Sequence, residues 1–222
     1  MLVSATDTNL LFGSMDWERV SPQILEKLKK YPTAIISDVL GRMTSLDSRI
    51  KRIAGNSLLV GTVFPITVAE GDNLAVHKAL DLAEPNDVFV INAKGQTSRA
   101  ILGDLVGDMM LKVGIEGAVI DGAVRDKDEL EKQGLQIFGT GLTAAGPWKN
   151  GPGELGMPAA CGGIVANPGD VIVADNDGAV IIPQNRIAEV ITGAEEVQAA
   201  EGAFRLRIQN DWKRSGRRTN AC

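Results

Sequence analysis

Histidine is almost absent from this chain: His77 is the only imidazole among 222 residues. A nucleophile paired with histidine, or a metal centre of two or three histidines, would have to be assembled from that one residue. His77 also falls in a predicted helix among apolar neighbours, which favours a packed or interfacial role. We therefore expect any chemistry to depend on carboxylates, arginine, backbone amides or an oxygen-ligated metal.

Cysteine is equally scarce, with only Cys161 and Cys222. Two cysteines so far apart exclude a disulfide-rich scaffold, and no Cys-x-x-Cys or Cys/His spacing predicts a structural zinc site. Residues 1–13 lack a basic region followed by an apolar stretch, and no apolar run approaches the roughly 18 residues of a membrane span. These features predict a cytoplasmic protein that is neither exported nor inserted in a membrane.

The chain has no excess of basic residues. Lys and Arg total 23 against 28 Asp and Glu, which gives a formal net charge of −5. Such a chain is a poor electrostatic partner for nucleic acid or an anionic membrane, so neither partner is expected. The one basic cluster, at 213–218, is interpreted as a solvated tail. A site for a carboxylate substrate would need positive potential of its own.

The composition is that of a globular protein, with 44% hydrophobic and 23% charged residues. A chain of this length buries enough surface to fold without disulfides or metal ions. No linker, repeat or low-complexity tract interrupts it. The sequence therefore predicts a single α/β domain over residues 1–222.

Helical and strand patterns alternate regularly from about Gly71. The runs at 88–91 and 118–120 are continuously apolar, which is typical of strands covered on both faces. This alternation predicts βαβ units and a parallel sheet, with functional groups at the carboxyl ends of its strands. The expected elements are helices at 73–83, 103–113 and 127–133 and strands at 88–92, 118–121 and 135–138.

The flanking segments predict further elements. A helix begins after Ser21, its expected N-cap, and is stopped by Pro32, and a second short helix follows at 33–40. The β-branched run 58–68 predicts a strand, in which Pro65 indicates an edge or a bulge.

The C-terminal third predicts a hairpin and a helix. Asp177-Gly178 lies between two β-branched runs, which is a strong signal for a hairpin over 171–182. Apolar residues then recur at helical spacing over about 185–212. We expect this last helix to pack on the body or to reach a neighbouring subunit.

The densest polar group follows the predicted strand 118–121, where Asp121 leads through a tight turn to Arg125 and Asp126. Arginine recognises carboxylates through paired hydrogen bonds, and aspartate is a hard oxygen ligand for Mg²⁺ or Mn²⁺. Both residues would stand at the start of the next helix, at the edge of a binding site. The same spacing also fits a structural role, with Asp126 at a helix N-terminus and Arg125 as its surface ion pair.

One βαβ unit earlier, Gly103-Asp104-Leu105-Val106 begins a predicted helix. The amides of Leu105 and Val106 would form an anion site there, Gly103 would let a ligand approach the backbone, and Asp104 would hold and polarise a water. The alternative is an ordinary helix start with an apolar first turn. Since both segments follow neighbouring strands, we expect them to face one crevice.

Several further segments form one pattern with the two described above. The pattern consists of 36–38, 71–75, 103–106, 119–126, 161–163, 168–170 and 175–178. Together these motifs resemble the metal-dependent 4-hydroxy-4-methyl-2-oxoglutarate (HMG) aldolases, whose superfamily includes the RraA-like regulators of ribonuclease activity. The joint pattern is specific, although each piece alone is weak, and it covers about residues 37–183. The resemblance implies an RraA-like layered α/β sandwich with a parallel βαβ core and a C-terminal hairpin plus helix.

The resemblance implies a divalent-metal-dependent pyruvate aldolase that also decarboxylates oxaloacetate. Asp126 would bind Mg²⁺ (or Mn²⁺), and Arg125 would hold the pyruvoyl group and stabilise its developing enolate. Amides around Leu105 and Val106 would bind the pyruvate carboxylate, and Asp104 would orient a water that shuttles protons. A Lewis acid and a guanidinium stabilise an enolate without histidine or a Schiff-base lysine.

The resemblance further implies a homotrimer or a hexamer with sites at subunit boundaries. A glutamate of the neighbouring chain's C-terminal region would complete each site, and Glu195, Glu196 and Glu201 are the candidates. The regulator branch tends to lose the acidic residue after the arginine, so the presence of Asp126 favours an enzyme. The alternatives are a non-catalytic trimeric regulator that binds a ribonuclease or helicase, and a related enzyme with another 2-oxo acid substrate.

Overall fold

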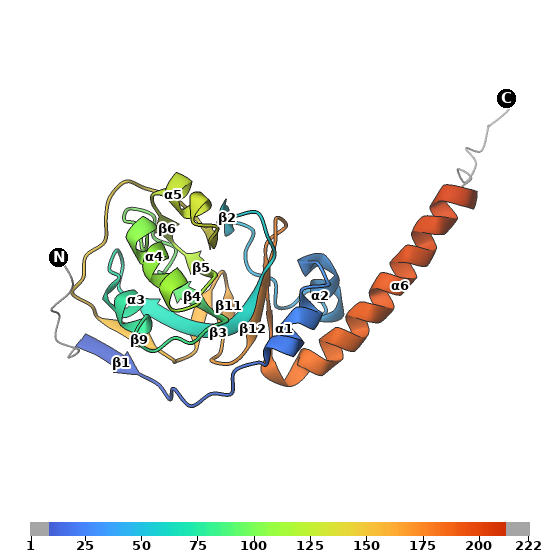
Figure 1. The fold of residues 1–222 in the computed structure, drawn as a ribbon, viewed down its shortest axis with the longest axis horizontal. Helices are drawn as coiled ribbons and strands as arrows, with labels where there is room; N and C mark the ends of the chain where they lie inside the picture. The colour runs from blue at the N-terminus through green and yellow to red at the C-terminus, as the bar shows by residue number, and fades with distance from the viewer. Residues whose placement is uncertain (1–8, 212–222) are drawn as a thin grey trace, which may run out of the picture.

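A nine-stranded sheet runs through the centre of the computed structural model, which describes residues 9–211 (Figure 1). The main strand order is β1-β9-β3-β4-β5-β7-β2, and β12 adds to β3 and carries β13. The predicted basic tail at 213–218, Cys222 and residues 1–8 lie outside the described residues. The helices are α1 (Pro22–Leu28), α2 (Thr33–Val39), α3 (Leu74–Ala79), α4 (Asp104–Lys112), α5 (Lys127–Lys132), η2 (Gln184–Arg186) and α6 (Ile187–Asp211). The strands are β1 (Leu10–Phe12), β2 (Lys51–Ala54), β3 (Leu59–Val68), β4 (Asp87–Asn92), β5 (Gly117–Asp121), β6 (Ala123–Val124), β7 (Gln136–Gly139), β8 (Gly141–Leu142), β9 (Gly153–Leu155), β10 (Ala159–Cys161), β11 (Ile164–Ala166), β12 (Val171–Ala174) and β13 (Ala179–Ile182).

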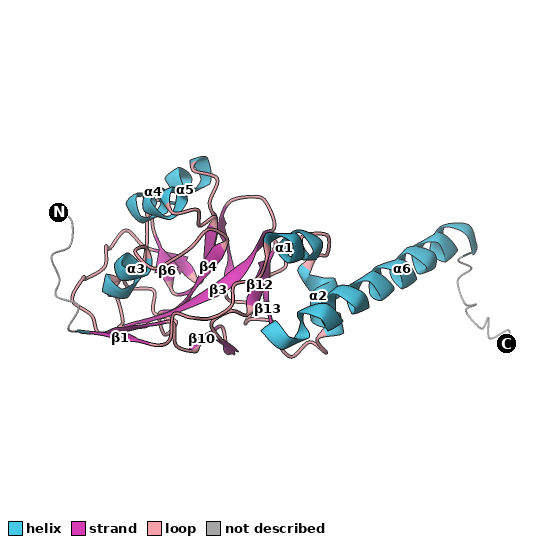
Figure 2. Cartoon of the chain, turned by 60° about the horizontal axis from the view of Figure 1, so that its bottom comes forward, coloured by secondary structure: helices cyan, strands magenta, loops and turns pink. Residues whose placement is uncertain are grey.

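The predicted parallel core is confirmed. Strands β3, β4, β5 and β7 pair in parallel, and helices α3, α4 and α5 lie over one face of the sheet (Figure 2). Along β4, Phe89 and Ile91 point into the helix-side core, whereas Val88 and Val90 point into a second core on the other face. The continuous apolar run of this strand therefore reflects burial on both sides.

A third core joins the C-terminal hairpin to three helices. The antiparallel hairpin β12–β13 is confirmed, and its outer face contributes Val171, Val173 and Val180. Apolar residues of α1, α2 and the first part of α6 pack on that face. The hairpin thus anchors the C-terminal helix to the body.

Pro65 corrects one expectation, because it lies in a central strand and not at an edge or a bulge. Strand β3 pairs with β4 in parallel on one side and with β12 and β9 in succession on the other. The Pro65 carbonyl accepts a hydrogen bond from the Gly156 amide at 3.1 Å, on the side where β12 has ended and β9 begins. The missing N–H of proline falls in that gap, so no ladder bond is lost.

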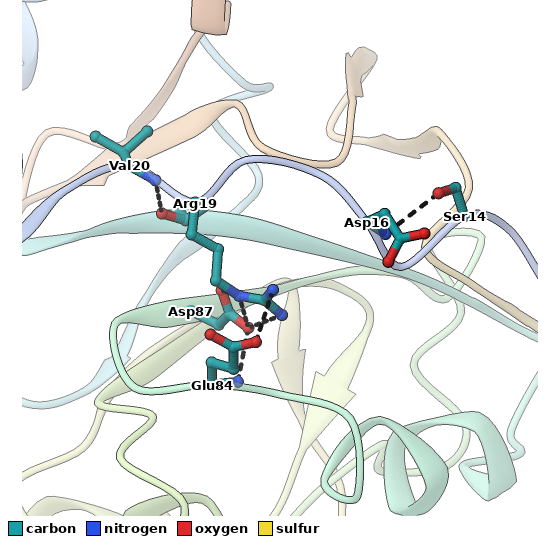
Figure 3. A network of polar contacts seen from close by, with 7 residues as sticks. Ser14, Asp16, Arg19, Val20, Glu84 and Asp87 are labelled. Atoms are coloured by element: carbon teal, nitrogen blue, oxygen red, sulfur yellow. Dashed lines mark hydrogen bonds and ion pairs between the residues drawn. The ribbon is translucent and has the colours of Figure 1, made fainter.

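The N-terminal segment is held to the sheet by a partly buried ion-pair cluster (Figure 3). Arg19 Nε and Nη2 each lie 3.0 Å from the carboxylate of Asp87, which is fully buried, and Arg19 Nη1 lies 3.0 Å from Glu84. The Val20 amide donates to Thr62 Oγ1 at 3.1 Å. Ser21 then stands at the N-cap of α1 as predicted, although its side chain makes no capping hydrogen bond.

Helix α6 leaves the body after its first turns and extends away from it (Figures 1 and 2). Its residues up to Val197 pack on the third core, but from Gln198 to Asn210 every side chain except Glu201 is exposed. Phe204, Leu206 and Ile208 are among them. No helix within residues 9–211 combines the length and apolarity needed to cross a membrane.

Candidate active site

The two predicted segments meet at the carboxyl edge of the parallel sheet. The Ile101 amide donates to the Ala123 carbonyl at 2.8 Å, and the Arg125 amide donates to the Leu102 carbonyl at 3.1 Å. Strand β6, which lies within the second segment, also pairs in parallel with β8. Backbone hydrogen bonds therefore fix the start of α4 beside Arg125 and Asp126.

Asp126 sits at the N-cap of α5 in a left-handed backbone conformation, with φ 55° and ψ 40°. Its Oδ2 lies 3.1 Å from Arg125 Nε, and the two side chains remain 35% and 38% exposed, respectively. This geometry also fits the structural alternative, in which Asp126 stands at a helix N-terminus and Arg125 is its surface ion pair. A surface ion pair alone does not require a left-handed residue, however, and such strained positions cluster at functional sites.

The first turn of α4 directs its amides at carboxylates of this chain. The Leu105 amide donates to Asp104 Oδ1 at 2.8 Å, and the Asp104 amide approaches Asp126 Oδ2 at a long 3.4 Å. The Leu105 side chain is exposed, whereas Val106 is buried. The start of α4 is thus a helix N-terminus with carboxylates at its first amides, as its partial positive charge favours, and its use as a substrate anion site stays a prediction.

Only glycine fits at position 103, because Arg125 and Asp126 pack directly against its backbone. A Cβ added there would collide with Asp126 Oδ2 and would lie 2.8 Å from Arg125 Cγ. The backbone at Gly103 is extended, so its conformation itself does not demand glycine. Its role is to let Arg125 and Asp126 pack directly over the start of α4.

Asp121 belongs to the scaffold and not to the site. Its buried carboxylate lies 2.7 Å from Arg49 Nη2 and accepts the Gly162 amide at 3.1 Å, which ties the end of β5 to the β10–β11 hairpin. Burial and the nearby Asp121 carboxylate raise the pKa of the Cys161 thiol. That cysteine is therefore a packed thiol and not a nucleophile.

Sequence reasoning missed Arg99, which reaches the same edge. Arg99 Nη1 donates to the Gly146 carbonyl at 2.7 Å, and its guanidinium lies 4.1 Å from the Trp148 ring centroid. The only sequence feature that could have indicated its role was the Gly/Pro-rich loop around Trp148, which was a candidate for lining a pocket. An open cavity of about 320 Å³ beside this loop carries acidic groups that are unsuited to a carboxylate ligand. Its lining is Ala69, Glu70, Asp72, Trp148, Asn150 and Gly151.

His77 lies on α3 and is half-buried, as a packed residue should be. Its Nε2 has no hydrogen-bond partner among residues 9–211. Burial lowers the pKa of the imidazole, and the charge of Lys149 lowers it further. His77 is therefore expected to be neutral at pH 7.

The donor set suits an oxygen-ligated metal that keeps most of its shell as water or substrate. Within residues 9–211, no three His, Cys, Asp or Glu side chains gather closely enough to hold an ion by themselves. Asp126, with Asp104 beside it, offers one or two carboxylates. Mg²⁺ is commonly bound in proteins through that number of carboxylates, whereas structural zinc sites are built from cysteine and histidine ligands.

Comparisons with known proteins agree on one family. Residues 33–181 match the RraA-like family, described as Aldolase/RraA. A Halalkalibacterium halodurans protein, provisionally named 4-hydroxy-4-methyl-2-oxoglutarate aldolase, is 42% identical over 84% of this chain and 89% of its own length. The Thermus thermophilus 4-hydroxy-4-methyl-2-oxoglutarate aldolase is 29% identical over 68% of this chain and 92% of its own.

Solved structures show the same fold. Streptomyces coelicolor RraAS2, an unusual member of the RNase ES inhibitor RraA family, superposes with a TM-score of 0.77 and 26% identity, covering 86% of this chain and 100% of that one. An uncharacterised Pseudomonas syringae protein gives the same TM-score and identity, with 89% and 97% covered. The predicted layered α/β architecture is confirmed.

Proposed function

This chain belongs to the RraA-like (Aldolase/RraA) family, and we propose that it is a divalent-metal-dependent carbon–carbon lyase. Its substrate would be HMG or a similar 2-oxo acid, from which it releases pyruvate, and it would also decarboxylate oxaloacetate. One observation carries the proposal: Arg125, Asp126 and the N-terminus of α4 are held together at one edge of the sheet.

Both reactions place the same demand on these residues. In aldol cleavage the C4 hydroxyl would pass its proton to the water that Asp104 orients, and the C4–O bond would become the carbonyl of the released 2-oxo product. The C3–C4 bond breaks in the same step, and its electrons pass to pyruvate enolate. In decarboxylation of oxaloacetate the C3–C4 bond breaks with loss of CO₂ and leaves the same enolate. Arg125 supplies positive charge and paired N–H donors for the enolate oxygen, which is the charge that develops in the transition state.

The start of α4 suits the substrate carboxylate and the final proton transfer. The substrate carboxylate would replace Asp104 Oδ1 as the acceptor for the Leu105 amide. Asp104, freed from that hydrogen bond, would orient a water that delivers a proton to C3 of the enolate. Substrate binding would thus free Asp104 to position the water that protonates the enolate.

Asp126 would hold the metal. When bound, a divalent cation polarises the 2-oxo group as a Lewis acid. Asp126 also orients the guanidinium of Arg125 through their ion pair.

Three glutamates of α6 are candidates for completing the site in another subunit. Two of them have partners within their own chain: Glu201 pairs with Arg205 at 3.5 Å, and Glu195 lies beside Tyr31.

The test is pyruvate release measured with a coupled lactate dehydrogenase assay. Protein stripped with EDTA should lose activity on HMG and oxaloacetate and regain it with Mg²⁺ or Mn²⁺. Arg125→Ala should lower kcat by about 10²- to 10³-fold, since a transition-state charge contact is removed. Activity indifferent to chelation would refute the metal, and no release from either substrate with metal present would refute the lyase.

The second candidate is a non-catalytic regulator, and the likeness to RraAS2 favours it. A regulator would release no pyruvate and would form a stable complex with a ribonuclease such as RNase ES. Titration of the two purified proteins by light scattering measures that complex directly. Turnover without complex formation would eliminate this candidate.

A further inference from the structure

Arg99 and Arg125 approach the same glycine from neighbouring loops. Arg99 Nη1 donates to the Gly146 carbonyl at 2.7 Å, and a Cβ added at Gly146 would lie 2.9 Å from Arg125 Nη1. The Ala100 amide donates to the Ala145 carbonyl at 2.8 Å, which holds these loops in register. Two guanidinium groups therefore flank one short segment at the candidate site.

The Arg99 side chain is held rigidly. Its guanidinium lies 4.1 Å from the Trp148 ring centroid, and its stem fills the space beside Gly71, where a Cβ would lie 2.8 Å from Arg99 Cδ. The side chain of Gln96 donates to the Arg99 carbonyl at 2.9 Å and accepts its amide at 3.2 Å. A cation fixed in this way loses little entropy when it binds a ligand.

The charge of Arg99 is not neutralised within residues 9–211. The Arg99 guanidinium contacts a carbonyl and an aromatic ring, and no carboxylate of these residues lies within ion-pair distance of it. A guanidinium has five N–H donors, so one carbonyl leaves most of them available. The carboxylate of Asp126 pairs with Arg125 and not with Arg99, so the Arg99 guanidinium beside Gly146 has no ion-pair partner within residues 9–211.

We infer that Arg99 binds the second carboxylate of the substrate, the one outside the pyruvoyl unit. This inference rests on the proposed function. HMG and oxaloacetate are both dicarboxylates, and the start of α4 with Arg125 accounts for only one carboxylate. Arg99 is a positioning and specificity residue that selects dicarboxylic 2-oxo acids over monocarboxylic ones.

The test is calorimetric binding with Mg²⁺ present, using 2-oxoglutarate as an uncleaved dicarboxylate and pyruvate as a monocarboxylate. Arg99→Met keeps an apolar stem against Trp148 and removes the charge. It should weaken 2-oxoglutarate binding about 10- to 100-fold, the range for loss of a charged hydrogen bond, and change pyruvate binding less than about twofold. The KM for oxaloacetate should rise in parallel, with kcat changed much less.

Arg52→Met is the matched control. Arg52 also lies over an aromatic ring, Phe138 at 4.6 Å, and hydrogen-bonds neutral side chains, but it lies on β2 away from Gly146. It should leave both ligands unaffected. Should Arg99→Met not fold, Arg99→Lys, which keeps the charge but not the planar fork, should still weaken 2-oxoglutarate selectively.

The outcomes separate the inference from the function on which it rests. Unchanged 2-oxoglutarate binding in the Arg99 variants, or an equal loss for pyruvate, would overturn the inference while pyruvate release by the parent protein stands. Selective loss of 2-oxoglutarate binding in a protein that releases no pyruvate would support the Arg99 subsite and refute the lyase.

Discussion

Asp126 carries both the charge and the backbone conformation on which the site depends. Left-handed conformations cost a non-glycine residue about 1–2 kcal/mol, and aspartate and asparagine tolerate them better than other side chains. Asp126 adopts this conformation with its carboxylate against Arg125 Nε. Substitutions can therefore separate the role of the charge from that of the backbone.

Asp126→Asn should keep the fold and lose the function. Asparagine accepts the left-handed backbone, so the melting temperature should change little, whereas pyruvate release should fall by about 100-fold or more as the only firm carboxylate of the metal site is removed. Asp126→Ala should lose the same activity and about 1 kcal/mol of stability. Equal stability of the two variants in urea unfolding would contradict the assigned strain.

At the scale of the element, the junction between α4 and α5 predicts a contrast between two glycines. Gly103→Ala would push Arg125 and Asp126 away from α4, and a misplacement of about 1 Å at a reacting centre costs about 100-fold in rate. The displaced side chains are partly exposed, so stability should fall little. Gly141→Ala is the control, because its new Cβ would lie 3.7 Å from Thr97 in ordinary contact. The rate of pyruvate release should fall in Gly103→Ala and stay unchanged in Gly141→Ala. An equal loss in both variants, or no loss in either, would argue against this packing.

Helix α2 is capped by a residue from a distant element. Its N-cap is Pro32, which offers no side-chain acceptor, and Asp175 at the end of β12 supplies one: Oδ1 accepts the Thr33 hydroxyl at 2.6 Å and Oδ2 the Thr33 amide at 2.9 Å. Burial disfavours the charged form of Asp175. Hydrogen bonds from Thr33 and from the amides of Asp177 and Gly178 outweigh it and hold the pKa of Asp175 below its ordinary value.

The stabilisation from Asp175 should depend on pH. A carboxyl whose folded pKa is depressed stabilises the fold above its unfolded pKa of about 3.9, and this contribution disappears as pH falls through the folded pKa. Asp175→Asn should cost about 1 kcal/mol at pH 7, as loss of a helix cap does, and less at pH 3. Urea unfolding at both pH values measures this, with Asp177→Asn as control. A cost independent of pH would contradict the cap.

Elements and site differ in how far the sequence determines them. Strands β4 and β5 and helix α4 follow from local periodicity, and the Gly103 and Arg125 segments were predicted to meet because parallel strands end at one edge. Pro65, by contrast, was misplaced because its neighbours β9 and β12 lie about a hundred residues further along. Arg99 was missed for the same reason: its acceptor Gly146 is 47 residues away.

At the scale of the whole molecule, we propose that α6 contacts another copy of this chain. A helix in water is stabilised mainly by packing one face, yet the part of α6 beyond Val197 packs on nothing in the described chain and presents Phe204, Leu206 and Ile208. The proposed metal site offers only Asp126, with Asp104 nearby. Both deficits would be met if α6 of one copy reached the site of another.

Mixed oligomers test this arrangement. Glu196 is exposed and forms no ion pair within residues 9–211, so we expect it to complete a neighbouring site, and Glu196→Gln should be inactive like Asp126→Asn. In co-assembled Asp126→Asn and Glu196→Gln chains, random association would place both native carboxylates at about a quarter of the sites, because each site draws one from each of two subunits. Pyruvate release should recover to that level, and Glu195→Gln and Glu201→Gln provide the comparison. If the mixture stays as inactive as its parents, while mass measurement shows that the chains have co-assembled, the two residues do not serve one site from different subunits.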